Sequence, residues 1–239
     1  MHPEHRALLD QLRQAARPLT GGRFDPQSYF GSGHAFLNVR APEQRRIARA
    51  WVAAHKSSPP DAVIALADSL FEGAALEEKT LAALLIEACR PARLAVRPAD
   101  VERWLEHLVG WAEVDSLCQN LFTADQMLAD WAAWSALIRR LVRDPNINKR
   151  RAGLVLLSGV VHRNGEARLA ALAFEMIETL KHERPVIITK AISWLLRGLL
   201  NHHRDEVAAY LDREAASLPA IAVRETRAKL VTGRKSGKA

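Results

Sequence analysis

The chain has 239 residues, of which 49% are hydrophobic and 26% are charged, and its formal net charge is +7. This balance is typical of a globular protein and excludes an intrinsically disordered chain. No apolar run approaches the roughly 20 residues of a membrane span, and the N-terminus lacks the apolar stretch of a signal peptide. We therefore expect a soluble, cytoplasmic protein. The positive charge favours an acidic partner, with nucleic acid ahead of a membrane surface.

Helical periodicity dominates the sequence from one end to the other. In segment 166–182, for example, Leu169, Leu172, Met176 and Leu180 recur at helical spacing. No segment alternates with the period of two that half-buried strands show. The periodicity and the proline and glycine breaks predict helices at about 3–16, 42–56, 59–71, 76–90, 98–110, 112–122, 124–142, 146–163, 166–182, 184–200, 204–216 and 219–231.

Helices of this length, joined by short turns, predict an all-α fold, either a solenoid of paired helices or a compact bundle. The spacing from one helix pair to the next is near 40 residues, which fits HEAT or armadillo-type repeats. Literal sequence repetition is not visible. We find no linker between parts of the chain, and so expect a single domain over residues 1–232. A basic, disordered tail is expected at 233–239.

The positive charge is concentrated in the second half of the chain. One cluster lies between Arg139 and Arg151 and another between Arg224 and Lys238, and each holds six basic side chains and a single acid. A solenoid would present such charges to a nucleic-acid duplex on its concave face. The alternative is that they belong to solvated helix faces without a partner.

Two helices carry polar and aromatic residues in an informative pattern. In segment 184–200 apolar residues cover most of the helix, and the remaining stripe holds Lys190, Trp194 and Arg197. A tryptophan within a basic stripe indicates contact with phosphate and sugar. Trp111 and Asp115 are four residues apart, so they share one helix face. The remaining tryptophans are expected in the core, namely Trp51, Trp104, Trp131 and Trp134.

Residues that bind metals or cofactors are not arranged in any known motif. Cys89 and Cys118 have no zinc-site or CxxC spacing, and we expect them to be reduced core residues. The histidines show no metal-ligand spacing, and there is no phosphate-binding glycine loop or dinucleotide fingerprint. We therefore predict neither a metal nor a cofactor.

Three motifs carry a family resemblance: Trp-x-x-x-Asp at Trp111 and Asp115, Arg-Arg-Ala at 150–152 and Lys-Ala-Ile-Ser-Trp-Leu-Leu-Arg at 190–197. Tyr29 and the stretches 36–37, 42–45, 70–73 and 78–79 add weaker matches. Over about residues 29–229 the chain resembles the bacterial DNA alkylation repair family, the AlkD-type alkylpurine DNA glycosylases. It departs from the family at Asn38, where a glycine is common, and at Gly153, where a larger residue is frequent.

The resemblance implies a superhelical stack of HEAT-like repeats whose concave basic face binds duplex DNA. We expect the protein to be a monomer. It also implies base excision repair of N3- and N7-alkylated purines, with the lesion still stacked. Asp115 would be the catalytic carboxylate, and Trp111 and Trp194 would frame the deoxyribose. Arg151 would bind phosphate, and Tyr29 would complete the cleft. The other residues expected to bind DNA are Arg45, Lys149, Arg150, Lys190, Arg197, Arg224, Arg227 and Lys229.

A single carboxylate suits this chemistry. A purine alkylated at N3 or N7 already carries a positive charge, so it departs as a neutral base with little help from a general acid. The sugar left behind resembles an oxocarbenium ion, which a nearby carboxylate stabilises. Glu113 is two positions from Asp115 and is expected to face elsewhere.

Simpler readings stay open for the same residues. Asp115 could cap a helix, and Arg151 could pair with Asp144 or Glu175. Two other functions also remain open, a non-catalytic nucleic-acid-binding protein of the same architecture and a HEAT-type adaptor for a protein partner. Substitution of Asp115 separates catalysis from both.

Overall fold

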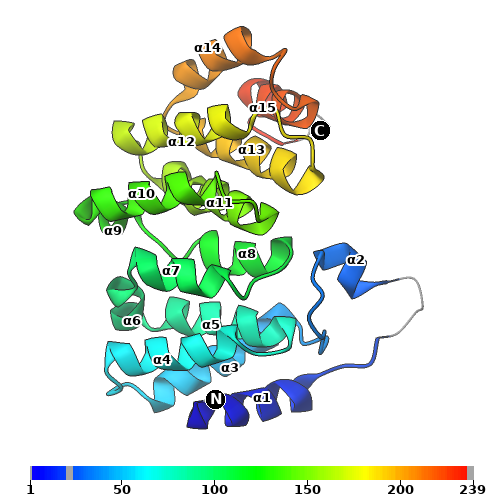
Figure 1. Cartoon of the computed structure of the whole chain (residues 1–239), viewed down its shortest axis with the longest axis vertical. Coiled ribbons are helices and arrows are strands. Elements are labelled where there is room, and N and C mark those ends of the chain that lie inside the picture. The colour runs from blue at the N-terminus through cyan, green and yellow to red at the C-terminus, as the bar shows by residue number, and fades with distance from the viewer. Residues whose placement is uncertain (1, 20–23, 236–239) are drawn as a thin grey trace. The chain divides into compact units, whose positions relative to one another are not determined.

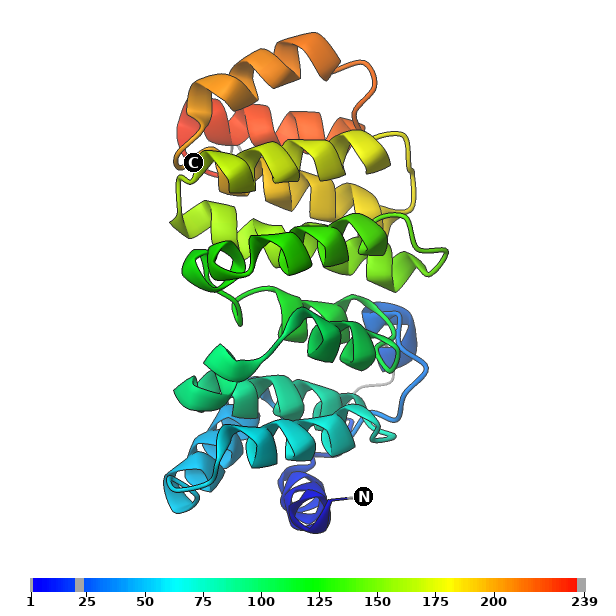
Figure 2. The same cartoon turned by 60° about the vertical axis from the view of Figure 1, so that its left-hand side comes forward.

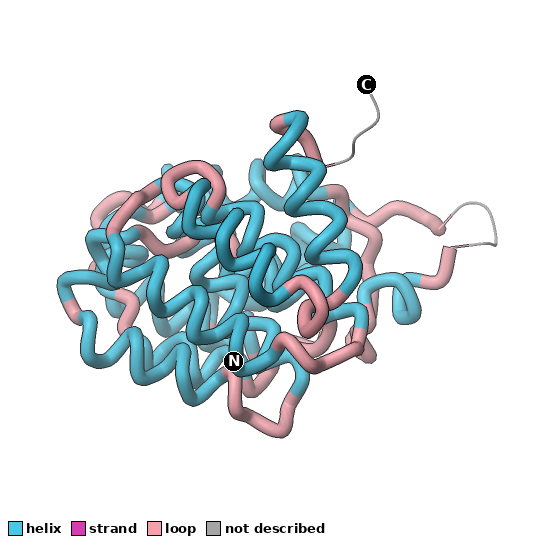
Figure 3. The backbone as a smooth tube through the Cα atoms, turned by 90° about the horizontal axis from the view of Figure 1, so that it is seen from above, coloured by secondary structure: helices cyan, strands magenta, loops and turns pink. Residues whose placement is uncertain are grey.

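The computed structural model describes residues 2–19 and 24–235. Within these ranges the regular secondary structure is helical, apart from a single bridge between Ala35 and Ala75 (Figure 3). The predicted all-α fold is confirmed. No helix in the described ranges has the length and apolar character needed to cross a membrane.

The helices follow one another along the chain as labelled in Figure 1. They are α1 (Pro3–Ala15), α2 (Pro26–Phe30), α3 (Ala41–Ala54), α4 (Pro60–Phe71), α5 (Leu76–Ala88), α6 (Arg90–Ala95), α7 (Pro98–Leu105), α8 (Trp111–Cys118), α9 (Ala124–Ala129), α10 (Trp131–Leu141), α11 (Ile147–Arg163), α12 (Ala167–Leu180), α13 (Val186–Leu199), α14 (Arg204–Glu214) and α15 (Ala220–Thr232).

Some helix boundaries differ from the prediction. The segment 124–142 is broken at Asp130, whose backbone is non-helical with φ −125° and ψ 56°, so it forms α9 and α10. The short α6 was not predicted; it starts beside Pro91, which lacks the N–H that would continue α5. The other unpredicted helix is α2, which begins after the N-cap Asp25.

The chain packs as two compact units, Met1–Leu117 and Cys118–Ala239, called unit 1 and unit 2 below. The single domain expected over 1–232 stays a prediction. In the segment expected as a tail, Gly233 ends α15 in the left-handed conformation with φ 72°, and residues 236–239 lie outside the described residues.

Unit 1 is built on α5, which packs against both α3 and α4. Leu66 and Leu70 of α4 and Leu81 and Leu85 of α5 are fully buried there. The first turn of α5 also buries three charged residues in succession, Glu77, Glu78 and Lys79. A buried charge is costly unless it is paired, so this turn must be tied to its surroundings by polar contacts.

Unit 2 has two layers of helices, visible in Figures 1 and 2. Helices α11, α13 and α15 pack side by side in one layer, and α10, α12 and α14 form the other. The first layer is closely packed because Gly198 of α13 leaves room for the Ser158 carbonyl of α11, which would lie 3.0 Å from an added Cβ. Many of the hydrogen bonds from one helix pair to the next join residues 32–36 positions apart.

The expected core tryptophans behave in two ways. Trp104 and Trp134 are almost completely buried and Trp51 is 9% exposed, which confirms the prediction for these three. Trp131 is only half-buried, and the guanidinium carbon of Arg168 lies 5.5 Å from its ring centroid. It is therefore a surface residue that stacks with a cation rather than a core residue.

Candidate functional site

The start of α8 brings Trp111 and Asp115 onto one face, one helical turn apart, as their spacing predicted. Both side chains are half-buried. Asp115 lies in the second turn of the helix rather than before its first residue, so it is not an N-cap. The indole Nε1 of Trp111 donates a hydrogen bond of 2.7 Å to the backbone carbonyl of Tyr29.

Tyr29 belongs to α2, a helix of five residues whose two ends are well defined. Asp25 accepts hydrogen bonds from the backbone N–H groups of Gln27 and Ser28, and Gly31 closes the helix with φ 66°. Such an Asx cap and left-handed glycine stabilise even a short helix. The ring of Tyr29 is 58% exposed and meets Trp111 edge-on at a centroid distance of 5.6 Å.

The contact between α2 and α8 is so close that it requires glycine. Gly110 precedes α8 with φ +84°, and a Cβ added there would lie 2.3 Å from the Phe30 carbonyl oxygen. Phe30 in turn contacts Trp111, with ring centroids 5.8 Å apart. We call Tyr29, Phe30, Trp111 and Asp115 the α8 cluster. It offers an exposed aromatic ring, an indole and a carboxylate from a single unit.

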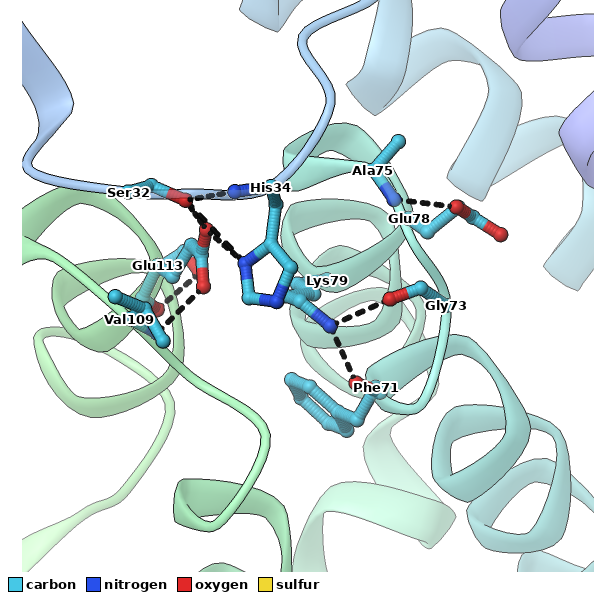
Figure 4. Close-up of polar contacts among 10 residues, drawn as sticks. Ser32, His34, Phe71, Gly73, Ala75, Glu78, Lys79, Val109 and Glu113 are labelled. Atoms are coloured by element: carbon cyan, nitrogen blue, oxygen red, sulfur yellow. Dashed lines mark hydrogen bonds and ion pairs between the residues drawn. The ribbon is translucent and has the colours of Figure 1, made fainter. Parts of the chain in front are cut away.

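Beneath the α8 cluster lies a buried carboxylate that sequence reasoning did not assign. Glu113 is 0% exposed. One of its oxygens accepts from the Ser32 hydroxyl at 2.5 Å and lies 2.9 Å from Nδ1 of His34, while the other accepts from the Val109 N–H at 2.8 Å (Figure 4). Glu113 does face away from Asp115, as expected, but it has a definite task there, joining the segment after α2 to the start of α8.

The charged first turn of α5 is satisfied by three different segments. Glu77 accepts from the backbone N–H groups of Leu37 and Val39, which oppose the rise in its pKa caused by burial. Glu78 lies 2.6 Å from Nε2 of His5. Lys79 donates to two backbone carbonyls at the end of α4, those of residues 71 and 73 (Figure 4). Burial lowers the pKa of Lys79, and the carboxylates of Glu113 and Glu78 oppose this change.

Asn38 lies in the loop that Glu77 holds, at a position where the family that the chain resembles commonly has glycine. Its φ is 60°, in the left-handed region that glycine and asparagine adopt most readily. Its side-chain amide donates to the backbone carbonyls of Arg17 and Pro18. Asparagine therefore replaces the usual glycine with a residue that tolerates the same backbone and adds two hydrogen bonds.

In unit 2, one face of α13 carries the residues that the sequence grouped, which we call the α13 stripe: Lys190, Trp194 and Arg197. The side chain of Lys190 is exposed, and that of Trp194 is half-buried. Arg197 is turned toward α15, where its Nε lies 3.5 Å from a carboxylate oxygen of Glu225. Burial lowers the pKa of Arg197 and Glu225 opposes this, so its guanidinium is partly engaged within the protein.

The basic residues around the start of α11 are also engaged. Arg151 is 5% exposed, and its Nη1 donates to the Ile187 carbonyl at 2.6 Å. Arg150 forms an ion pair of 2.8 Å with Glu183. Lys149 lies 3.5 Å from Asp144. The two acids proposed as alternative partners of Arg151 have other cations beside them, Lys149 for Asp144 and Arg139 for Glu175.

The remaining predicted DNA-binding residues differ in how accessible they are. Arg45, Arg224 and Arg227 are exposed. Arg45 lines a cavity of about 280 Å³ together with Arg49 and Arg93. Lys229 donates to the Arg197 carbonyl, and burial lowers its pKa. The exposed arginines can meet phosphate directly, whereas one of the three N–H donors of Lys229 is already used within the protein.

Sequence reasoning missed Glu113, Ser32, His34 and Gly110. Glu113 stood inside the Trp-x-x-x-Asp motif, but a lone acid on a helix is normally solvated, and its partners lie 79 and 81 residues earlier in the chain. The α2 helix did leave a signal, since Asp25-Pro26 followed by Gly31 is the pattern of a capped helix. Among the described residues no group of three His, Cys, Asp or Glu side chains could hold a metal ion.

Comparison with known proteins gives a consistent result. The model of the family described as "DNA alkylation repair enzyme" matches residues 8–230. A solved structure, "Predicted DNA alkylation repair enzyme from Enterococcus faecalis", is similar to this chain with a TM-score of 0.69 and 16% identity. The similarity covers 86% of this chain and 93% of that one, and at this identity it shows a shared fold. No curated protein matches.

Proposed function

Since the chain belongs to the family of DNA alkylation repair enzymes, we propose that it is a DNA glycosylase for N3- and N7-alkylated purines in duplex DNA. The observation that carries the proposal is the α8 cluster, in which Asp115 and the indole of Trp111 lie one turn apart on α8 and the exposed ring of Tyr29 packs against that indole. A carboxylate beside aromatic faces suits a sugar on which positive charge develops.

In the proposed reaction water replaces the alkylated base at C1′ of the deoxyribose. The C1′–N bond breaks with its electron pair moving to the cationic purine, which leaves neutral. Asp115 stabilises the oxocarbenium-like sugar and positions the water, whose proton it can accept. Two opposite charges about 4 Å apart attract by at most about 4 kcal/mol at an effective dielectric of 20. This corresponds to roughly three decades in rate.

The proposed DNA grip comes from cations that are exposed, Arg45 in unit 1 and Lys190, Arg224 and Arg227 in unit 2. Contacts of this kind bind any duplex and weaken with salt. The family resemblance assigns Trp194 and Arg151 to the lesion as well, and we retain both in the proposal. Neither a cofactor nor a metal takes part in it, because the departing base supplies its own positive charge. We also propose that the protein acts as a monomer in the cytoplasm.

The test is release of free base from a duplex with a single N7-methylguanine, by the parent protein and its Asp115→Asn variant. The asparagine keeps the shape of the side chain but removes the charge, so we expect it to bind the duplex as well as the parent and to lose about a thousandfold in rate. Asp61→Asn is the matched control, since Asp61 is an exposed acid of α4 in the same unit.

The outcomes separate the alternatives. Normal turnover by Asp115→Asn would refute the catalytic assignment. Tight duplex binding without base release by either protein, repeated with N3-methyladenine, would support the non-catalytic DNA-binding function. Weak binding with a steep loss in salt and no dependence on Trp111 would instead support an adaptor for a protein partner.

A further inference from the structure

Glu113 occupies an unusual position, fully buried in the same helix turn as the half-buried Trp111 and Asp115. Its two carboxylate oxygens meet three polar groups, the Ser32 hydroxyl, Nδ1 of His34 and the Val109 N–H (Figure 4). A carboxylate removed from water is costly unless it is satisfied in this way. An apolar residue would fill the same space without that cost, but it would supply neither these contacts nor the negative charge that Glu113 places near the buried Lys79.

The segments that Glu113 joins are the two that meet where α2 contacts α8. Ser32 follows Gly31, the residue that closes α2, and Val109 precedes Gly110, the residue that packs against the end of α2. The Ser32 hydroxyl also accepts a hydrogen bond from the backbone N–H of His34, which fixes the turn after α2. One carboxylate therefore holds both sides of the contact through side-chain and backbone donors.

The contact matters because α2 supplies half of the α8 cluster. Tyr29 reaches Trp111 through its backbone carbonyl, 2.7 Å from the indole Nε1, and through its ring, at a centroid distance of 5.6 Å. Tyr29 itself is 58% exposed, and its ring also contacts the rings of Phe24 and Phe30, which belong to the same stretch of chain, at centroid distances of 5.5 and 5.0 Å. Its position depends on how the two ends of α2 are anchored.

We propose that Glu113 is a positioning residue for base excision, acting through α2 to hold Tyr29 against Trp111. This inference rests on the proposed glycosylase function. Glu113 touches neither the lesion nor the water in this scheme. It sets the geometry of the residues that do, and a displacement of about 1 Å in such residues can cost up to a hundredfold in rate.

The chemistry of the three contacts predicts which substitutions preserve the arrangement. In Glu113→Gln the amide oxygen can accept from the Val109 N–H, and the amide NH₂ can donate to the Ser32 hydroxyl oxygen and to Nδ1 of His34 in its other tautomer. All three contacts can therefore persist in Glu113→Gln. Glu113→Ala loses all three contacts. Ser32→Ala loses one of them and leaves the carboxylate with the other two.

The experiment is a double-mutant cycle between Glu113→Ala and Tyr29→Ala, read as the single-turnover rate of N7-methylguanine release at saturating protein. We expect Glu113→Ala to lower the rate by roughly 10- to 100-fold and Glu113→Gln to stay within a few-fold of the parent. In the Tyr29→Ala background Glu113→Ala should have little further effect, because the residue that it positions is already absent.

Glu77→Ala provides the matched control. Glu77 is another fully buried carboxylate of unit 1 that holds the same loop, through the Leu37 and Val39 N–H groups, without touching α8. Glu77→Ala should lower the rate by the same factor in the parent and in the Tyr29→Ala background. The proposal would be overturned if Glu113→Ala also lowered the rate by the same factor in both backgrounds, or if Glu113→Ala had the parent's rate. If Glu113→Ala does not fold, Ser32→Ala takes its place in the cycle.

A second readout separates this inference from the proposed function. Amide hydrogen exchange over residues 27–31 reports how firmly α2 is held, whether or not the protein releases a base. If the parent shows no excision, the glycosylase function fails. The inference that Glu113 positions α2 is then supported if Ser32→Ala or Glu113→Ala raises the exchange rate there at least tenfold more than Glu77→Ala does. It is overturned if the exchange rate is unchanged.

Discussion

Replacing Gly110 with alanine is the sharpest test of how the α8 cluster is built. A Cβ at this position would lie 2.3 Å from the Phe30 carbonyl oxygen, where ordinary contacts begin at 3.4 Å, so the end of α2 must retreat by about 1 Å. The φ of +84° adds a cost of roughly 1–2 kcal/mol for a residue with a side chain. Loss of the hydrogen bond from Trp111 to the Tyr29 carbonyl adds about 1 kcal/mol.

We therefore expect Gly110→Ala to destabilise the protein by about 2–3 kcal/mol, which lowers the melting temperature of unit 1 by roughly 10 °C. Base release should slow by up to about a hundredfold because Tyr29 is displaced. Differential scanning fluorimetry and single-turnover excision measure the two effects. Gly33→Ala is the control, since a Cβ there would meet no heavy atom within 4 Å. If the two variants melt and excise alike, the close contact does not position α2.

Two further predictions concern unit 2. In fluorescence anisotropy titrations of a duplex, Lys190→Ala should make the slope of log affinity against log salt concentration shallower by about one. Its thermal stability should be unchanged. An unchanged slope would show that Lys190 does not contact the DNA. Hydrogen bonds from Arg139 lower the pKa of Glu175 in the folded protein. The pair therefore stabilises the fold at pH values above the pKa of an unfolded glutamate, and this stabilisation is lost as the pH falls through the lowered pKa. In urea unfolding measured between about pH 3 and 6, the free energy of unfolding of Glu175→Gln should therefore fall less steeply with falling pH than that of the parent. The same pH dependence in both proteins would show that the pair contributes nothing.

The sequence predicted the helices well but not all of their breaks. Apolar residues continue at helical spacing from Met127 to Leu141, because both α9 and α10 bury one side, so periodicity alone could not reveal the break at Asp130. The periodicity of apolar residues reports which positions are buried, and a single non-helical residue between two helices does not disturb that pattern. The loop before residue 33 hid α2 for the opposite reason, since five residues are too few to show a period.

For the candidate site, local spacing and long-range contacts differ in how far they can be predicted. The shared face of Trp111 and Asp115 follows from helix geometry alone. The burial of Glu113 follows from a partner segment about 80 residues earlier in the chain, which no local pattern contains. Charge clusters were least informative, because Arg150 and Arg227 both belonged to the predicted basic clusters, yet the first is held by Glu183 and the second is exposed.

The two units distribute their polar contacts differently, and this has a consequence for how each should unfold. In unit 2 the bonds at intervals of 32–36 residues join each helix pair only to the next. Stability of this kind is a sum over nearest neighbours, so the last pair, α14 and α15, can open while α11 stays folded. In unit 1 the first turn of α5 ties α1, α4 and the segment 37–39 together. None of these segments can detach without leaving a buried charge of α5 without its partner, so unit 1 should unfold as a whole, and the chain should melt in more than one step.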